Sequence, residues 1–321
     1  MATQLSSGIY HLDVHDVDFE AAHLYEHLLI ASFREHVYTH GLSRYLYGWV
    51  EGETFRRVMY ITYDFYHPDA EPLFHAFMTN PGRIDYSLLD RELARLQAES
   101  RAIVSVFDRR ELVAQLAHID QQVFVDHRQA FAAARYECSK YDEDISSRVI
   151  PMKRSSAAFR RITVLFGLEN LSLDELVASQ RIAPILYEAF DDEMFRMGAY
   201  KNDASYLVKE AGTPFYVGGS FYTIRRGQYT TAQMTAALTA SLEKIAADVG
   251  AHPEQLDHYT AAFVGSALWS DAPRRYYNHS GVITSNRAVA QALSVERLLA
   301  LLPRVNIRVM STNDAHLKLL R

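Results

Sequence analysis

Residues 23–27 read H-L-Y-E-H, with two histidines four positions apart and a glutamate directly before the second. On an α-helix these positions share one face, so His23, Glu26 and His27 point the same way. Two imidazoles at this spacing can bind one zinc ion, and a catalytic zinc site takes a third protein ligand and keeps a position for water. Glu26 is then placed to take a proton from that water. A solvated helix face with three polar residues is the alternative interpretation.

Two other histidine pairs have the same spacing but no glutamate between their members. His36 and His40 fall near the end of the same predicted helix, and we interpret them as its polar end. His11 and His15 fall in a predicted strand, and we interpret them as surface residues. Neither pair is as strong a metal-site candidate as the H-L-Y-E-H segment.

The composition is that of a soluble globular protein. The chain has 321 residues, of which 49% are hydrophobic and 22% charged, and its formal net charge of −6 does not favour nucleic-acid binding. The single cysteine, Cys138, excludes an intrachain disulfide, and no apolar run reaches the length of a membrane span. The first residues lack the pattern of a signal peptide. We therefore expect a cytoplasmic protein that binds neither nucleic acid nor a membrane.

The first half of the chain alternates strand and helix patterns. We predict a strand or strand pair over 8–19, a helix over 20–39, a strand over 54–66, and helices over 69–79 and 85–117.

The second half repeats this mixture. We predict a strand over 161–168, a helix that begins at a capping box of Ser172 and Glu175, and its continuation over 183–198. A strand with a turn follows over 213–224, and then a helix that ends at Gly250. The pattern predicts two α+β domains, 1–150 and 151–321.

The H-L-Y-E-H segment resembles the inverted zinc motif H-x-x-E-H of the pitrilysin family, which includes insulin-degrading enzyme and the mitochondrial processing peptidase. In that family the third ligand is a later glutamate on a helix, and another glutamate precedes it by seven residues. The segment R-E-L-A-R-L-Q-A-E-S supplies both, as Glu99 and Glu92. The resemblance implies one zinc ion per chain, bound by His23, His27 and Glu99, with Glu26 as the general base. Glu92 would not contact the metal itself but would orient one of the residues that bind it.

The second half is also similar to this family. The family has an arginine followed seven residues later by a tyrosine, and both contact the substrate and the developing oxyanion. Lys209 and Tyr216 occupy these positions in L-V-K-E-A-G-T-P-F-Y. The family's N-A-x-T segment, whose asparagine binds the substrate backbone, reads E-G-E-T here, so Glu51 takes the asparagine's place. The resemblance implies catalytic roles for Lys209 and Tyr216 and a substrate contact for Glu51.

The resemblance also implies an architecture and an activity. The two domains would be related α/β sandwich-like units, together half of a clamshell, and a homodimer or a heterodimer with a related chain would complete it. A peptide substrate would add a strand to a sheet edge, for which 218–224 and 58–63 are the candidates. The implied function is a zinc-dependent endopeptidase that hydrolyses short peptides or processes a peptide precursor inside the dimeric chamber.

Three alternatives remain open from the sequence. The first is a non-catalytic scaffold subunit of a peptidase-like complex, which the E-G-E-T segment and the short halves favour. The second is a metal-bearing module that binds a peptide without cleaving it. The third is an unrelated α+β protein without a metal. The presence of all four residues His23, Glu26, His27 and Glu99 favours the enzyme, because a scaffold has no physical need for them.

Overall fold

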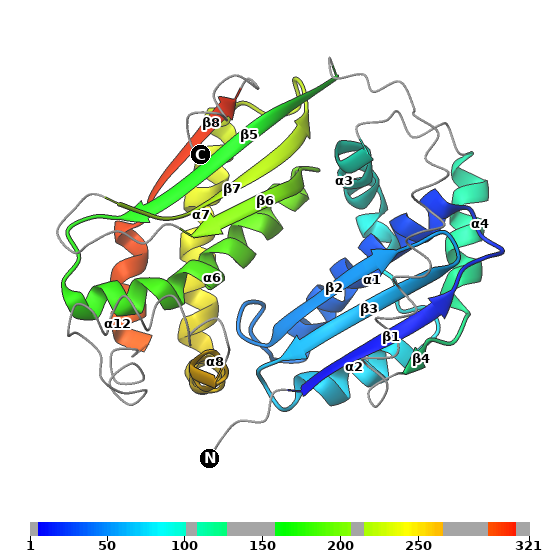
Figure 1. Cartoon of the computed structure of the whole chain (residues 1–321), viewed down its shortest axis with the longest axis horizontal. Coiled ribbons are helices and arrows are strands. Elements are labelled where there is room, and N and C mark those ends of the chain that lie inside the picture. The colour runs from blue at the N-terminus through cyan, green and yellow to red at the C-terminus, as the bar shows by residue number, and fades with distance from the viewer. Residues whose placement is uncertain (1–5, 101–107, 127–157, 207–214, 266–294, 313–321) are drawn as a thin grey trace. The chain divides into compact units, whose positions relative to one another are not determined.

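The computed structural model describes residues 6–100, 108–126, 158–206, 215–265 and 295–312. They belong to two compact units, one within residues 5–155 and the other within 156–321. Each unit is a four-stranded antiparallel sheet with helices packed against it (Figure 1). The predicted α+β class is confirmed. The predicted boundary between residues 150 and 151 lies outside the described residues.

The first unit carries the H-L-Y-E-H segment on its longest helix. Its elements are β1 (Ser6–Asp13), α1 (Phe19–Thr39), β2 (Gly48–Thr54), β3 (Val58–Phe65), α2 (Ala70–Thr79), the 3₁₀ turn η1 (Tyr86–Leu88), α3 (Leu89–Ser100), α4 (Arg109–Asp120) and β4 (Val125–Asp126). The strand order is β2-β3-β1-β4, and all neighbours are antiparallel. Among the described strands, β2 is therefore an edge of this sheet.

The second unit repeats the topology of the first. Its elements are β5 (Phe159–Leu168), α6 (Leu173–Arg196), β6 (Tyr200–Tyr206), β7 (Phe215–Arg225), α7 (Thr231–Ala251), α8 (Pro253–Gly265), α12 (Val295–Leu301), the 3₁₀ turn η3 (Leu302–Arg304) and β8 (Asn306–Thr312). The strand order is β6-β7-β5-β8. In both units the first strand lies between the second strand of a hairpin and the last strand. The two halves are thus built on one plan.

Helix α1 is the central element of the first unit. The Asp18 side chain accepts a hydrogen bond from the Glu20 N–H and so caps the start of the helix. Leu24, Leu28 and Phe33 are buried against the sheet, where they join a core rich in aromatic rings. Helices α3 and α4 also contact α1. Because α1 is covered on more than one side, several of its polar residues are buried as well.

Three predicted elements of the first unit differ from the structure. The strand predicted over 8–19 ends at Asp13, because residues 14–18 turn to reach the cap of α1. The strand predicted over 54–66 is a hairpin, in which β2 ends at Thr54 and the Phe55 N–H donates to the Val58 carbonyl over 2.8 Å. The helix predicted over 85–117 is two helices, since the Asp108 side chain caps a new helix, α4, at Arg110.

In the second unit the capping box is confirmed, and one predicted helix end and one predicted turn differ from the structure. Ser172 and Glu175 exchange hydrogen bonds at the start of α6. Helix α7 continues through Gly250 to Ala251, so the predicted end at Gly250 is wrong. The predicted turn in 213–224 is also wrong where the chain is described, because β7 continues through Gly218, with only a shift in its register with β5 between Tyr216 and Gly218. A side chain at Gly218 would lie 2.6 Å from the ring of Tyr187, so glycine permits a close approach there.

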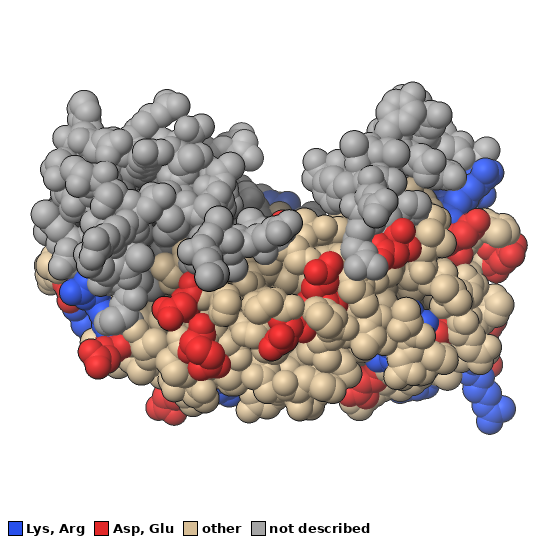
Figure 2. Space-filling view, turned by 90° about the horizontal axis from the view of Figure 1, so that it is seen from below, with Lys and Arg blue, Asp and Glu red and all other residues tan. Residues whose placement is uncertain are grey.

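Acidic side chains are dispersed over the described residues on the face that Figure 2 draws. On the face drawn in Figure 2, Asp and Glu side chains are interspersed with uncharged residues and do not gather into one patch. Within the described residues, no helix combines the length and apolar character needed to cross a membrane. The acidic balance of the chain is therefore not concentrated at one site of this face.

The aromatic core of the first unit gives a stability prediction. Phe74 is 1% exposed, and its ring lies 4.7 Å from that of Phe33, 5.1 Å from Tyr63 and 5.4 Å from Phe65. Phe74→Ala should lower the free energy of unfolding by about 3–5 kcal/mol, measured by urea unfolding. Val123→Ala, at a side chain that is 79% exposed, should change it by less than about 0.5 kcal/mol. Equal losses in the two variants would contradict the assigned core.

Candidate metal centre

Helices α1 and α3 bring three possible metal ligands together. Glu99 Oε2 lies 3.5 Å from His23 Nε2 and 3.4 Å from His27 Nε2. The three ligand atoms all lie within 4.8 Å of one another, and the two imidazole rings are perpendicular with centroids 4.9 Å apart. Buried Leu89 and Leu96 anchor α3, and the same seven-residue spacing puts Glu92 and Glu99 on one face of it. The structure thus assembles the three predicted ligands.

The donor set and its geometry fit a tetrahedral metal ion. Ligand atoms about 2.0–2.1 Å from a zinc ion lie about 3.4 Å from one another, which matches the two separations to Glu99. Glu99 Oε2 is buried and has no hydrogen-bond partner among the described residues. A carboxylate oxygen buried in this way is destabilising unless something positive contacts it. Two imidazole nitrogens and one carboxylate oxygen suit zinc, and they also accept manganese or cobalt.

Both histidines are in the neutral form that binds a metal. Burial lowers the pKa of His23 to about 4, and the neighbouring His27 lowers it further. Burial likewise lowers the pKa of His27 to about 3, with a second contribution from the cation of Arg95. At neutral pH neither imidazole carries the extra proton that would compete with a metal ion.

Glu26 lies beside the ligands and is fixed by strand β2. Its side chain is buried, and Oε2 accepts a hydrogen bond from the Thr54 hydroxyl. A side chain at Gly52 would lie 2.6 Å from Glu26 Oε1, so this glycine makes room for the carboxyl group. Burial raises the pKa of Glu26 to about 8, while the Thr54 hydrogen bond acts in the opposite direction. Without a metal the carboxyl is protonated at neutral pH, and a nearby cation would favour its ionised form.

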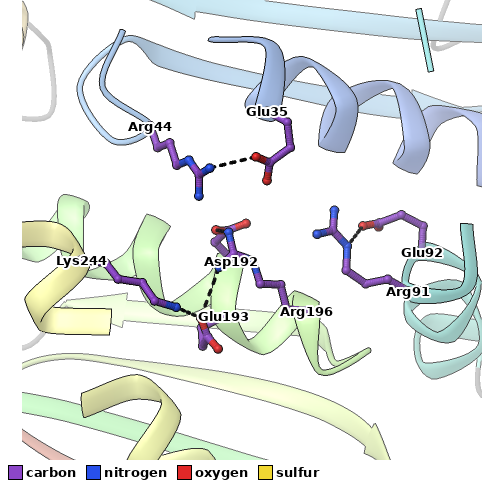
Figure 3. A network of polar contacts seen from close by, with 8 residues as sticks. All are labelled: Glu35, Arg44, Arg91, Glu92, Asp192, Glu193, Arg196 and Lys244. Atoms are coloured by element: carbon purple, nitrogen blue, oxygen red, sulfur yellow. Dashed lines mark hydrogen bonds and ion pairs between the residues drawn. The ribbon is translucent and has the colours of Figure 1, made fainter. Parts of the chain in front are cut away.

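Glu92 is buried behind His27 and is paired with two arginines. Arg91 Nε lies 2.8 Å from one of its oxygens (Figure 3), and Arg95 NH1 lies 2.6 Å from the other. Glu92 Oε2 is 3.8 Å from His27 Nδ1, too far for a hydrogen bond. Sequence reasoning did not assign Arg95, although its position three residues after Glu92 on a helix favours an ion pair. It also did not assign Thr54 and Gly52 to the support of Glu26.

The other predicted site residues are not part of this cluster. Glu51 is exposed, and the alternation of β2 puts it on the opposite face from Gly52 and Glu26. Lys209 lies outside the described residues. Tyr216 is in β7, paired in register with Gly167, and its side chain is not among those described. The roles assigned to Glu51, Lys209 and Tyr216 stay predictions.

The two segments proposed as peptide-binding edges are in the interior of their sheets. Segment 58–63 belongs to β3, which pairs with β2 and β1, and segment 218–224 belongs to β7, which pairs with β5 and β6. That expectation is wrong, because a strand with two neighbours has no free backbone groups to offer. The edge nearest to Glu26 is β2.

No second group of three such ligands occurs in the described part of the chain. His36 and His40 have ring centroids 4.0 Å apart at the end of α1, but no acidic residue completes a site with them there. His40 Nδ1 lies within hydrogen-bond distance of the His36 carbonyl oxygen, at 2.8 Å. This agrees with their interpretation as the polar end of the helix.

Comparison with known proteins gives structural similarities at low identity. Neither a protein-family model nor a curated protein sequence matches the chain. Among solved structures, a mutant of the ferredoxin protease FusC in complex with Arabidopsis ferredoxin is 9% identical, with a TM-score of 0.36. The match covers 96% of this chain but only 42% of FusC.

Two further structures match over nearly their whole length. A predicted M16-like peptidase from Alicyclobacillus acidocaldarius is 12% identical, with 97% of this chain and 93% of that chain covered and a TM-score of 0.31. A protease from Helicobacter pylori is 11% identical, with 97% and 94% covered and a TM-score of 0.27. All three similar structures are named as proteases or peptidases. TM-scores this low give no basis for transferring residues or substrates to this chain.

The buried Glu26 carboxyl gives a pH-dependent prediction for the metal-free protein. Its pKa is raised from the ordinary 4.5 to about 8 in the folded state. As the pH rises, Glu26 therefore loses its proton at a lower pH in the unfolded chain than in the folded one. The free energy of unfolding that the neutral carboxyl contributes is lost as the pH rises from about 4.5 to 8. Glu26→Gln is neutral throughout and can still accept a hydrogen bond from Thr54. It should stabilise the fold at pH 8 by about 1–4 kcal/mol and much less at pH 5.

Thermal unfolding in the presence of a chelator measures this effect at the two pH values. Glu51→Gln is the matched control, because that side chain is exposed on the other face of β2. It should leave the melting temperature unchanged at both. If Glu26→Gln gave the same shift at pH 5 and pH 8, the carboxyl would not be held neutral by burial.

Proposed function

We propose that the protein is a zinc-dependent endopeptidase that hydrolyses short peptides or processes a peptide precursor. The observation that carries this proposal is the position of Glu99 Oε2, which is buried, lacks a hydrogen-bond partner and lies 3.4–3.5 Å from two imidazole nitrogens. Beside it lies the carboxyl group of Glu26, which is not one of the three proposed metal ligands. A structural zinc site fills all four positions with protein ligands, whereas three ligands and a spare carboxyl are typical of hydrolases.

Each side chain of the cluster has a role in this reaction. His23, His27 and Glu99 would hold the zinc ion, which supplies a Lewis acid that activates water and polarises the scissile carbonyl. Glu26 accepts a proton from the attacking water and passes it to the leaving amine. The Thr54 hydroxyl and the space at Gly52 keep the Glu26 carboxyl in place during both transfers.

Strand β2 offers a place for the peptide. It is a sheet edge among the described strands, and an extended peptide can add to such an edge through backbone hydrogen bonds. Residues Gly52 and Thr54 of this strand contact Glu26. A peptide paired with β2 would therefore run close to the general base. The free backbone groups of β2 support binding of extended peptides with little dependence on their sequence.

The proposed enzyme works as a dimer. Lys209 and Tyr216 of the second half would stabilise the oxyanion as preorganised donors. Because the proposed chamber needs four domains and one chain supplies two, the second half of a partner subunit would complete the site. The partner is an identical chain or a related one. A single cysteine and the lack of a membrane-spanning helix in the described residues fit a cytoplasmic enzyme.

Metal content and peptide cleavage together test the proposal. The purified protein should hold about one zinc per chain, and both Glu99→Gln and His27→Ala should lose it. Glu26→Gln should keep the zinc and lose cleavage of a peptide library by at least about a hundredfold. Zinc without cleavage, together with stoichiometric peptide binding, would instead identify a peptide-binding module. A parent protein that takes up no zinc when it is supplied would identify a scaffold.

Gly52 provides a second test that separates the metal from the base. Gly52→Ala places a methyl group where the Glu26 carboxyl lies, so that carboxyl has to move away. The variant should retain zinc and lose cleavage about as strongly as Glu26→Gln. Gly250→Ala is the control, because its methyl group would meet only a Leu299 carbon at 3.9 Å. Full activity in Gly52→Ala would show that Glu26 is not held by β2 as described.

A further inference from the structure

A second candidate site lies on the opposite face of the first sheet from α1. Side chains alternate along β1, so Tyr10 and Leu12 enter the core beneath α1 while His11 and Asp13 face the other way. On β3, Val58 and Tyr60 share the outer face and form a small separate apolar cluster with Ile9. This face carries none of the proposed metal ligands.

A cavity of about 500 Å³ opens on this face. Its described lining consists of two histidines, two arginines, an aspartate, a tyrosine and one apolar residue, namely His11, His15, Arg56, Arg57, Asp13, Tyr60 and Val58. Its volume is within the range of small-molecule sites. The lining is mostly polar and charged, unlike the apolar gaps that imperfect packing leaves behind.

Two guanidinium groups at this cavity have no partner. Arg56 and Arg57 occupy the turn between β2 and β3, which the hydrogen bond from the Phe55 N–H to the Val58 carbonyl closes. Within the described structure neither side chain makes a hydrogen bond or an ion pair. Two adjacent cations repel each other, and this repulsion is relieved when an anion binds between them.

Asp13 is the acidic group among the described lining residues, and it is paired with a histidine. His15 Nδ1 lies 2.6 Å from Asp13 Oδ1, and its Nε2 lies 3.1 Å from Asp16 Oδ2. The hydrogen bond to Asp13 raises the pKa of His15, so the protonated form is favoured. With His15 protonated, the three cations His15, Arg56 and Arg57 exceed the carboxylates of Asp13 and Asp16 by one positive charge. This is a local positive site on a chain whose formal net charge is −6.

We propose that this cavity binds a small molecule that carries a phosphate group. Arg56 and Arg57 present two adjacent planar forks that match phosphate oxygens, and the excess positive charge of the cavity favours an anion. The rings of His11 and Tyr60 lie beside these charges, tilted by 40° with centroids 6.2 Å apart. The site is independent of the proposed peptidase reaction, because it lies across the sheet from His23, His27 and Glu99.

Calorimetric titration of the full-length protein with inorganic pyrophosphate tests the proposal. The dicarboxylate succinate is titrated in parallel, to distinguish a phosphate site from a carboxylate site. Pyrophosphate should bind the parent protein, and the double variant Arg56→Gln with Arg57→Gln should bind about ten- to a hundredfold more weakly. Arg110→Gln, at an exposed arginine on α4 outside the cavity, should bind like the parent. Circular dichroism of each variant shows that it is folded.

Several results would overturn the proposal, of which three concern pyrophosphate binding by the parent and its variants. They are no detectable pyrophosphate binding by the parent at millimolar concentration, equal binding by the double variant, and equal loss in Arg110→Gln. Succinate binding as tight as that of pyrophosphate would also overturn it, because the site would then select carboxylates. Repeating the titration after chelation of metals should give the same affinity, and a loss of binding there would assign the anion to the metal centre instead.

Discussion

The first unit depends on how the polar side chains buried between α1 and α3 are satisfied. A buried charge without a partner destabilises a fold by several kcal/mol, on the order of its whole net stability. Glu92 is balanced by Arg91 and Arg95, and burial keeps Glu26 in its neutral form while its carboxyl accepts a hydrogen bond from Thr54. Glu99 Oε2 has no hydrogen-bond partner among the described residues. A cation shared with the two imidazoles would supply the interaction that this oxygen lacks.

The same balance of charges links metal binding to the state of the base. Because two arginines already neutralise Glu92, the ligand set offers a divalent ion two neutral imidazoles and one negative charge from Glu99. A site occupied in this way has one positive charge in excess. Glu26 ionises as the counter-charge, since a nearby cation favours the carboxylate over the acid. The raised pKa of Glu26 in the metal-free protein is therefore compatible with a base that acts at neutral pH.

Helical periodicity predicted which candidate site residues share a face of one helix. It could not predict the contacts between different helices and strands. The spacing of His23, Glu26 and His27, and the separation of Glu92 from Glu99, follow from residue positions on one helix. The contacts of Glu26 with β2 depend on which strand packs against α1, which no local pattern reveals.

Turn residues gave the same lesson for the fold. The hairpin at 55–57 was missed because F-R-R lacks the glycine, proline or asparagine that mark turns. A turn was predicted within 213–224, whereas Gly218 in this segment belongs to a strand and accommodates Tyr187.

The repeated topology, finally, bears on whether the chain is a scaffold. Helix α6 follows the first strand of its sheet as α1 does, and its buried Asp191 is fully paired with the Tyr222 hydroxyl and with Lys201 Nζ at 2.6 Å. A scaffold needs only such completed pairs, because unpaired polar atoms lower its stability. Helix α1 instead faces Glu99 Oε2, which has no hydrogen-bond partner among the described residues, and a metal ion bound as proposed would supply a favourable contact to this oxygen.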